Sequence, residues 1–177
     1  MNLAKKGLIV FCAVLTAAMP TNLFAVELTE EQIGNISSNC SSIKLQLQKV
    51  QRMDAKSRVH LGAQFEAIAN SLMMNLNLRL VKNNRANGDI ASQQAEFSNV
   101  RERFKKDYIE YQKELEELIG INCKDDPYRF YEQLEYVRAR RDDMGWSITR
   151  LREIADEHRR SVLDMREELY DKEHPNE

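Results

Sequence analysis

The strongest constraint on this chain is a long apolar repeat in its C-terminal part. Its positions step alternately by four and three residues, and all are apolar except Arg141 and His158. A β-strand would alternate with period two and would not reach this length, so the spacing predicts an α-helix over residues 127–171. Because the repeat averages 3.5 residues, this face should pack against other helices with a left-handed supercoil. We call these positions the C-terminal seam: Phe130, Leu134, Val137, Arg141, Met144, Ile148, Leu151, Ala155, His158, Val162, Met165 and Leu169.

A second helix is predicted over residues 90–120, between two clusters of turn-forming residues at 83–89 and 120–127. Asp89 or Ser92 is expected to cap its first turn by accepting hydrogen bonds from free backbone N–H groups. The apolar face of this helix is also spaced by threes and fours: Phe97, Val100, Phe104, Tyr108, Tyr111, Leu115 and Leu118.

The first helical segment, residues 29–83, is longer and less regular. The sequence TEEQ at 29–32 has the spacing of a capping box. Two stretches weaken the helix pattern: SSNCSS at 37–42, and 54–62, where Asp54 and Ser57 occupy positions expected to be apolar. Two alternatives fit the sequence. The helix is broken at one of these stretches, or it is continuous with a local change of supercoil. Further along, the apolar face is expected to comprise Leu61, Phe65, Ile68, Leu72, Leu76 and Leu80.

Three such segments predict an all-α fold, an elongated up-down-up three-helix bundle formed by one helical domain over residues 26–177. One difficulty follows from the lengths. The first segment, counted from residue 42, exceeds the second by roughly 16 Å at 1.5 Å per residue. Either the first helix is broken, or the connection at 82–90 runs back along the bundle.

Residues 1–25 have the three-part pattern of a secretory signal peptide. Lys5 and Lys6 precede a short apolar run, and a more polar stretch ends at Ala25. The apolar run is shorter than the roughly 20 residues that span a bilayer, although an uncleaved anchor is the alternative. The rest of the chain has no second long apolar stretch, so no membrane span is expected in the mature chain. The signal-peptide pattern predicts a secreted or extracytoplasmic location.

The charge balance of the mature chain is mildly acidic. Removing residues 1–25 takes two lysines from the 26 basic residues and none of the 28 acidic ones, which leaves a formal charge of −4. Nucleic acid is therefore not expected as a partner, since phosphate binding requires a basic face. On the third helix, basic and acidic residues alternate, and we expect Arg138–Asp142, Arg152–Asp156 and Asp156–Arg160 to pair across one turn.

Cys40 and Cys123 are the two cysteines that remain in the mature chain. In an exported protein they are expected to form an intramolecular disulfide. In an up-down-up bundle, the start of the first helix and the loop before the third lie at the same end, which places the two cysteines near each other. Free thiols and a bond to another chain are the alternatives.

Residues that carry chemistry are few, so no catalytic, cofactor-binding or metal site is expected. The three histidines are widely separated, and the chain has no nucleophile motif, phosphate-binding glycine loop or CxxC pair. Asp126 is expected to cap the third helix, with Pro127 as its first residue. His158 is expected to fix register within the seam. Trp146 lies outside the seam, where it either covers a flank of the core or contacts a partner.

The segment RFKKDYIEYQKELEELIGINCKDDPYRFYEQLEYVRARRDD resembles a pattern in secreted helical proteins of Saccharibacteria and related Candidate Phyla Radiation bacteria. The resemblance covers about residues 95–165. Its features are an acidic-aromatic helix, an I-x-C turn and a proline-aromatic entry to an arginine-rich helix: Ile121, Cys123, Pro127, Phe130 and Tyr131. It implies a bacterial, exported coiled-coil protein and brings no catalytic residues with it.

These observations favour a non-enzymatic structural or protein-interaction module of the cell envelope or cell surface. Its partner would be another protein or a second copy of the chain. The alternative is an extracytoplasmic holdase, a chaperone that holds unfolded chains between elongated helices.

Overall fold

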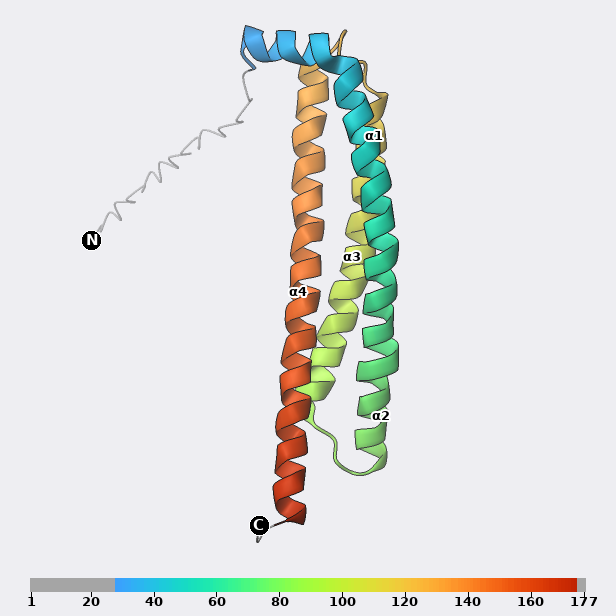
Figure 1. Cartoon of the computed structure of the whole chain (residues 1–177), viewed down its shortest axis with the longest axis vertical. Helices are drawn as coiled ribbons and strands as arrows, with labels where there is room; N and C mark the ends of the chain where they lie inside the picture. Colours follow the sequence, from blue (N-terminus) through green and yellow to red (C-terminus); the bar gives the residue numbers. More distant parts are fainter. Residues whose placement is uncertain (1–27, 175–177) are drawn as a thin grey trace, which may run out of the picture.

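The computed structural model describes residues 28–174, so the predicted signal peptide lies outside the described residues. Over this range the chain is helical and contains no strand, which confirms the all-α prediction. Three long helical stretches run antiparallel to one another as a bundle, down, up and down again in the view of Figure 1. The elements are α1 (Glu30–Glu66), η1 (Ala67–Met74), α2 (Asn75–Lys82), α3 (Gly88–Gly120) and α4 (Pro127–Glu173).

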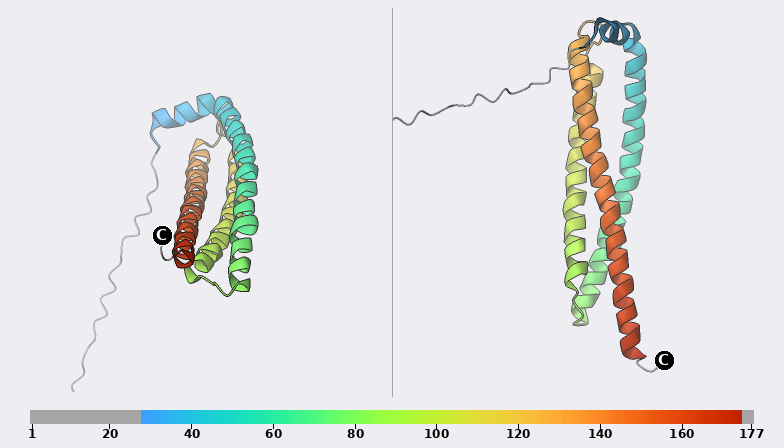
Figure 2. Two further views of the ribbon diagram at one scale, coloured as in Figure 1. Left: turned by 60° about the horizontal axis from the view of Figure 1, so that its bottom comes forward. Right: turned by 90° about the vertical axis from the view of Figure 1, so that its left-hand side faces the viewer.

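The predicted first helix is one continuous stretch made of α1, η1 and α2. Its first turns lie across the end of the bundle before the helix bends to run along α3 and α4 (Figures 1 and 2). Near the bend, Ser38 Oγ donates to the carbonyl of Gly34 at 2.7 Å, and Asn39 Nδ2 donates to that of Asn35 at 3.0 Å. Side-chain bonds to the preceding turn tend to bend helices. The chain therefore bends near residues 37–42 and stays helical through 54–62.

The predicted difference in length between the first and second helical stretches is accommodated at both ends of the first. The bend takes the first turns out of the bundle direction, and the 83–87 connection runs back from α2 to the start of α3 (Figure 1). Asn84 has φ 55°, the left-handed conformation that reverses the chain direction. Asn87 caps α3 by accepting from the N–H groups of Asp89 and Ile90. The prediction of a cap at Asp89 or Ser92 was wrong because the helix begins earlier, at Gly88.

The disulfide between Cys40 and Cys123 is present, as predicted, with a Cα–Cα distance of 5.5 Å. Both cysteines are buried. The bond joins the transverse first turns of α1 to the loop between α3 and α4. Beside it, Asp126 caps α4 by accepting from Arg129 N at 3.1 Å, and Pro127 occupies the first turn.

Helices α3 and α4 pack most closely against each other, while α1 lies somewhat apart from this pair (Figure 2). Every predicted apolar position of α3 is buried. The ring of Phe65, from α1, meets those of Phe97 and Phe104 edge-on, with centroids 6.1 and 5.8 Å apart. An aromatic cluster of this kind adds dispersion energy to ordinary apolar burial.

Two of the polar interruptions of the apolar pattern, Asp54 in α1 and Arg141 in the C-terminal seam, face each other. Both carboxylate oxygens of Asp54 accept from Arg141, each at 3.1 Å. The hydroxyl of Tyr111, in α3, donates to Asp54 Oδ2 at 2.6 Å. One residue from each helix therefore forms a polar layer across the bundle. A polar layer of this kind fixes helix register, because a shifted register would leave its groups unpaired.

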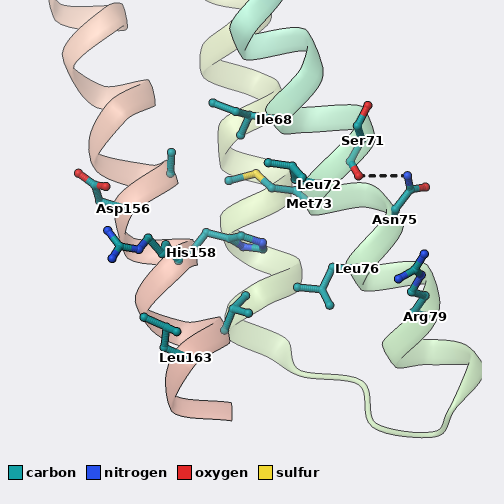
Figure 3. A pocket seen from close by; sticks show the side chains of 13 residues that line it. Ile68, Ser71, Leu72, Met73, Asn75, Leu76, Arg79, Asp156, His158 and Leu163 are labelled. Atoms are coloured by element: carbon teal, nitrogen blue, oxygen red, sulfur yellow. Dashed lines mark hydrogen bonds between the residues drawn. The ribbon is translucent and has the colours of Figure 1, made fainter. Parts of the chain in front are cut away.

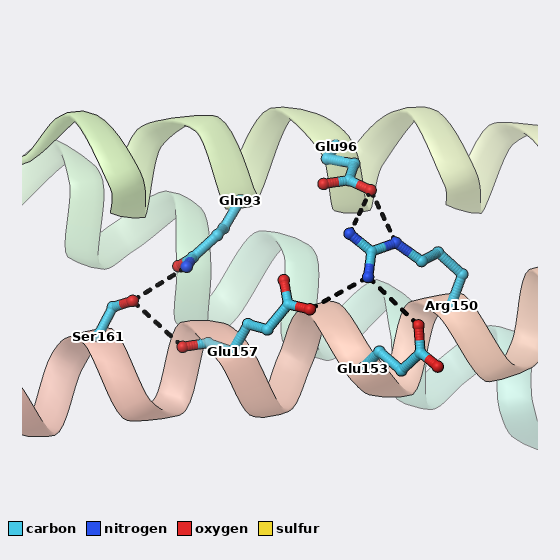
Figure 4. A network of polar contacts seen from close by, with 6 residues as sticks. All are labelled: Gln93, Glu96, Arg150, Glu153, Glu157 and Ser161. Atoms are coloured by element: carbon cyan, nitrogen blue, oxygen red, sulfur yellow. Dashed lines mark hydrogen bonds and ion pairs between the residues drawn. The ribbon is translucent and has the colours of Figure 1, made fainter.

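A second polar cluster joins α3 to α4 (Figure 4). Arg150 contacts Glu96 at 2.7 Å, Glu157 at 3.1 Å and Glu153 at 3.2 Å. Hydrogen bonds to these carboxylates raise the pKa of Arg150, and the bond to Glu96 has the largest effect. Gln93 donates to Ser161 Oγ at 3.0 Å.

The charge pairs predicted within the third helix do not form among the described residues. Arg138 pairs with Glu135, not with Asp142. The side chains of Arg152, Asp156 and Arg160 make no ion pair with any residue of 28–174. Unpaired charge is therefore left on the second half of α4.

Candidate interaction groove

The π-helical segment η1 changes which apolar residues of the first helix reach the core. The sequence pattern predicts Leu72 in the core, but Leu72 is 62% exposed and its neighbour Met73 is 1% exposed. A π-turn bonds i to i+5 and so adds one residue to a turn. From Phe65 the core positions continue through Ala69 to Met73, one residue out of phase with the prediction. The run Leu72–Met74 is apolar at every position, so either phase satisfies the sequence pattern.

Displacement of Leu72 leaves an open groove between η1–α2 and α4 (Figure 3). Its volume is about 610 Å³. Its apolar surface comes from both walls: Ile68, Leu72, Met73 and Leu76 from one, and Ala155, Val162 and Leu163 from the other. Leu72 and Leu163 are both exposed at its edge. The groove is thus a concave apolar surface that no segment of residues 28–174 fills.

His158, predicted to fix register, lies inside this groove. Its side chain extends from α4 toward η1 (Figure 3) and is 7% exposed. Nδ1 is buried and has no hydrogen-bond partner among the described residues. Burial lowers the pKa of the imidazole, because desolvation disfavours the charged form. The groove therefore contains a neutral imidazole at neutral pH.

The rim of the groove carries unequal charge. Residues 67–88, which form the wall of η1 and α2 and the following loop, contain Arg79, Lys82 and Arg85 and no acidic residue. On the α4 wall, Arg159 and Asp156 line the groove. None of these five side chains makes an ion pair within the described part of the chain. Of the three basic residues of this segment, Arg79 lines the groove.

Trp146 lies outside the residues that line the groove. Its side chain is 52% exposed, and the guanidinium of Arg103 lies 4.7 Å from the ring centroid. The indole is thus in contact with a cation and is about half exposed. Its predicted role as a partner contact stays a prediction.

The groups that carry chemistry do not converge. Within residues 28–174, no three His, Cys, Asp or Glu side chains are grouped to hold a metal ion. His60, His158 and His174 belong to different parts of the bundle. Asp54, beside a smaller hollow of about 320 Å³, is already bonded to Arg141 and Tyr111. No helix of the described chain combines the length and the apolar character needed to cross a bilayer.

Comparison with known proteins adds no relative: no family model, curated protein or solved structure matches this chain.

Proposed function

We propose that this protein is an exported, non-enzymatic coiled-coil module that binds a protein partner in the cell envelope or at the cell surface. The open apolar groove between η1 and α4 carries the proposal. Apolar surface rimmed by charged residues is typical of protein interaction sites. The groove also lies between two helices, which is the geometry that receives an amphipathic helix.

The extracytoplasmic part of the proposal is supported by the disulfide and by the signal-peptide pattern. Cysteines pair and stay paired in oxidising compartments. The resemblance of residues 95–165 to secreted helical proteins of Saccharibacteria extends the proposal to a bacterial envelope.

The non-enzymatic part is supported by how the polar groups are used. Asp54, Tyr111 and Arg141 bond to one another across three helices. Arg150 is surrounded by three carboxylates. These groups brace the bundle, whereas the groove offers shape, apolar surface and charge.

Site-specific photo-cross-linking in the producing cells tests this proposal. A photoreactive residue replaces Leu72 in the groove, with Leu45 as the matched control. Leu45 is 65% exposed on α1 and does not line the groove. We expect one discrete adduct from position 72 and none from position 45. Absence of any adduct from position 72 in exported protein would reject the proposal.

A holdase chaperone is the second candidate. It is favoured by large apolar side chains exposed singly along α1 and α2: Leu45, Met53, Val59, Leu78 and Val81. A holdase predicts a broad set of adducts from both probe positions and suppressed aggregation of an unrelated denatured protein. A discrete adduct from position 72 alone would reject this candidate.

A further inference from the structure

His158 is a polar group of the groove that the bundle leaves without a partner. Its side chain extends from α4 toward η1 and is 7% exposed (Figure 3). Nδ1 is enclosed and Nε2 is not, and neither nitrogen forms a hydrogen bond with a residue of 28–174. A buried polar group without a hydrogen bond is costly, so native proteins pair nearly all of them. The imidazole therefore marks a place where a group from outside the chain completes the hydrogen bonding.

The groove has the size and the lining of a site for a small molecule. Its volume of about 610 Å³ lies within the range of roughly 300–1,000 Å³ that is typical of ligand pockets. Such pockets are lined mainly by apolar side chains, and a few polar groups fix the orientation of the ligand. The wall from Ile68 to Arg79 is roughly 16 Å long at 1.5 Å per residue, which suits an elongated ligand. The apolar lining comes from both walls: Ile68, Leu72, Met73, Leu76, Ala155 and Val162.

The charges that line the groove favour an anionic head group. Arg79 and Arg159 belong to opposite walls, and neither forms an ion pair within the described part of the chain. Asp156, a carboxylate of the lining, lies at the other end of the groove from Arg79 (Figure 3). A neutral imidazole can donate one hydrogen bond, and a guanidinium can bind a carboxylate through two. A carboxylate at His158 would thus have a donor inside the groove and a cation on each rim.

We propose that the groove binds a single-chain amphiphile with a carboxylate head, such as a fatty acid. The chain lies against the apolar walls and the carboxylate accepts a hydrogen bond from His158, with Arg79 and Arg159 neutralising it from the rims. The inference goes beyond the proposed function, because it assigns a small ligand to the groove and requires no protein partner. A bound chain covers the apolar surface that a partner helix would use, so ligand and partner would exclude each other.

Calorimetric titration of the purified, disulfide-bonded protein tests the ligand class, with dodecanoate below its micellar concentration as the probe. We expect one site, and affinity that falls about fourfold for each methylene removed from the chain. Dodecyltrimethylammonium, which has the same chain length and the opposite charge, should bind about tenfold more weakly or not at all. Equal binding of both amphiphiles would overturn the inference. Binding to vesicles of anionic phospholipid without binding to dodecanoate would overturn it too.

Two exposed leucines provide a matched test of the position of the chain. Leu72 lines the groove and is 62% exposed, whereas Leu45 is 65% exposed and does not line it. Leu72→Asp should weaken dodecanoate binding about tenfold or more, because it places a carboxylate on the apolar surface. Leu45→Asp makes the same change in charge and should leave binding unchanged. An equal effect of the two substitutions would show adsorption to exposed apolar side chains in general.

Four exposed arginines test the head group in the same way. Arg79→Gln/Arg159→Gln removes the two cations of the groove and should weaken dodecanoate binding about fivefold. Arg152→Gln/Arg160→Gln is the control with the same change in net charge, at residues that do not line the groove. Equal weakening in both variants would show attraction by net charge alone and would overturn the assignment of the head group.

The histidine ring resonances in NMR spectra show where the carboxylate lies. Dodecanoate should shift the ring signal of His158, which is assigned by its loss in His158→Leu. The signal of His60 should stay in place, since His60 does not line the groove. His158→Leu should also weaken binding about tenfold, and His158→Gln, which keeps a hydrogen-bond donor, should restore part of it. Dodecanoate binding that leaves the His158 signal unmoved would overturn the inference.

Failure of this inference is distinguishable from failure of the proposed function, because the titrations contain no protein partner. Dodecanoate binding without an adduct from position 72 in cells supports the ligand site and rejects the protein partner. A discrete adduct without dodecanoate binding overturns the ligand site and leaves the interaction module standing. Where both are found, saturating dodecanoate should suppress the adduct in cell extracts, and an unaffected adduct would overturn the shared use of the groove.

Discussion

The carboxylate of Asp54 and the guanidinium of Arg141 bind each other through two hydrogen bonds, each 3.1 Å long, across 87 residues of sequence. Each residue breaks an apolar repeat on its own helix. Together with Tyr111 they form a layer in which every charged or hydroxyl group has a partner. Arg141 is 54% exposed and Asp54 14%, so the ion pair itself contributes modestly and the buried hydroxyl contributes more.

Asp54→Ala should lower the free energy of unfolding by about 1–3 kcal/mol, because it leaves the hydroxyl of Tyr111 buried without an acceptor. In a Tyr111→Phe background the same substitution should cost roughly 1 kcal/mol less, since no hydroxyl is then stranded. Urea unfolding of the four proteins measures the difference. An equal cost in both backgrounds would show that the hydrogen bond to Tyr111 contributes nothing.

The adjacent residues Leu72 and Met73 provide a matched test of the phase change in η1. Met73→Ala should destabilise the fold by about 2–5 kcal/mol, as expected when a buried large side chain is truncated. Leu72→Ala should change stability by less than about 0.5 kcal/mol, because its side chain is largely exposed. Chemical denaturation compares the two. The reverse ranking would restore Leu72 to the core and remove the groove.

His158 should make stability depend on pH in the weakly acidic range. Burial lowers its pKa in the folded state below the usual value of about 6.5. The unfolded chain therefore binds more protons there. The contribution to the unfolding free energy is fully present above about pH 6.5 and is lost as pH falls toward the lower folded-state pKa. His158→Leu should flatten this slope between roughly pH 7 and pH 5, whereas exposed His60→Leu should retain it. An unchanged slope in His158→Leu would contradict the assignment.

Removal of the disulfide should destabilise the protein strongly. The bond closes a loop with a sequence separation of 83, for which the chain-entropy relation predicts roughly 4–5 kcal/mol. Cys40→Ala/Cys123→Ala should show this loss in guanidinium unfolding, and reductant should then have no further effect on that variant. The transverse first turns of α1 should also lose amide protection before the α3–α4 pair does. Uniform protection would show that the bond does not hold these turns in place.

Periodicity in the sequence was sufficient for much of the fold. Steps of three and four residues identified three helical stretches and the buried face of α3 at every position. Two cysteines in a chain that was expected to be exported, placed at one end of an up-down-up bundle, predicted the disulfide. Asp126 and Pro127 predicted the start of α4. These features depend on residues close in sequence or on a single topological choice.

Three features were decided only by the tertiary structure. In the sequence, Asp54 and Arg141 interrupt the apolar repeats of two different helices. Their pairing could not be predicted, because the repeat on one helix carries no information on which residue of another helix faces it. It placed Leu72 in the core, because the apolar run Leu72–Met74 fits either phase of the helix and packing against α3 selected Met73. The groove arises from that selection together with the position of His158 on α4. A sequence determines which face of each helix avoids water, whereas only the packed bundle determines which faces meet and where a surface is left uncovered.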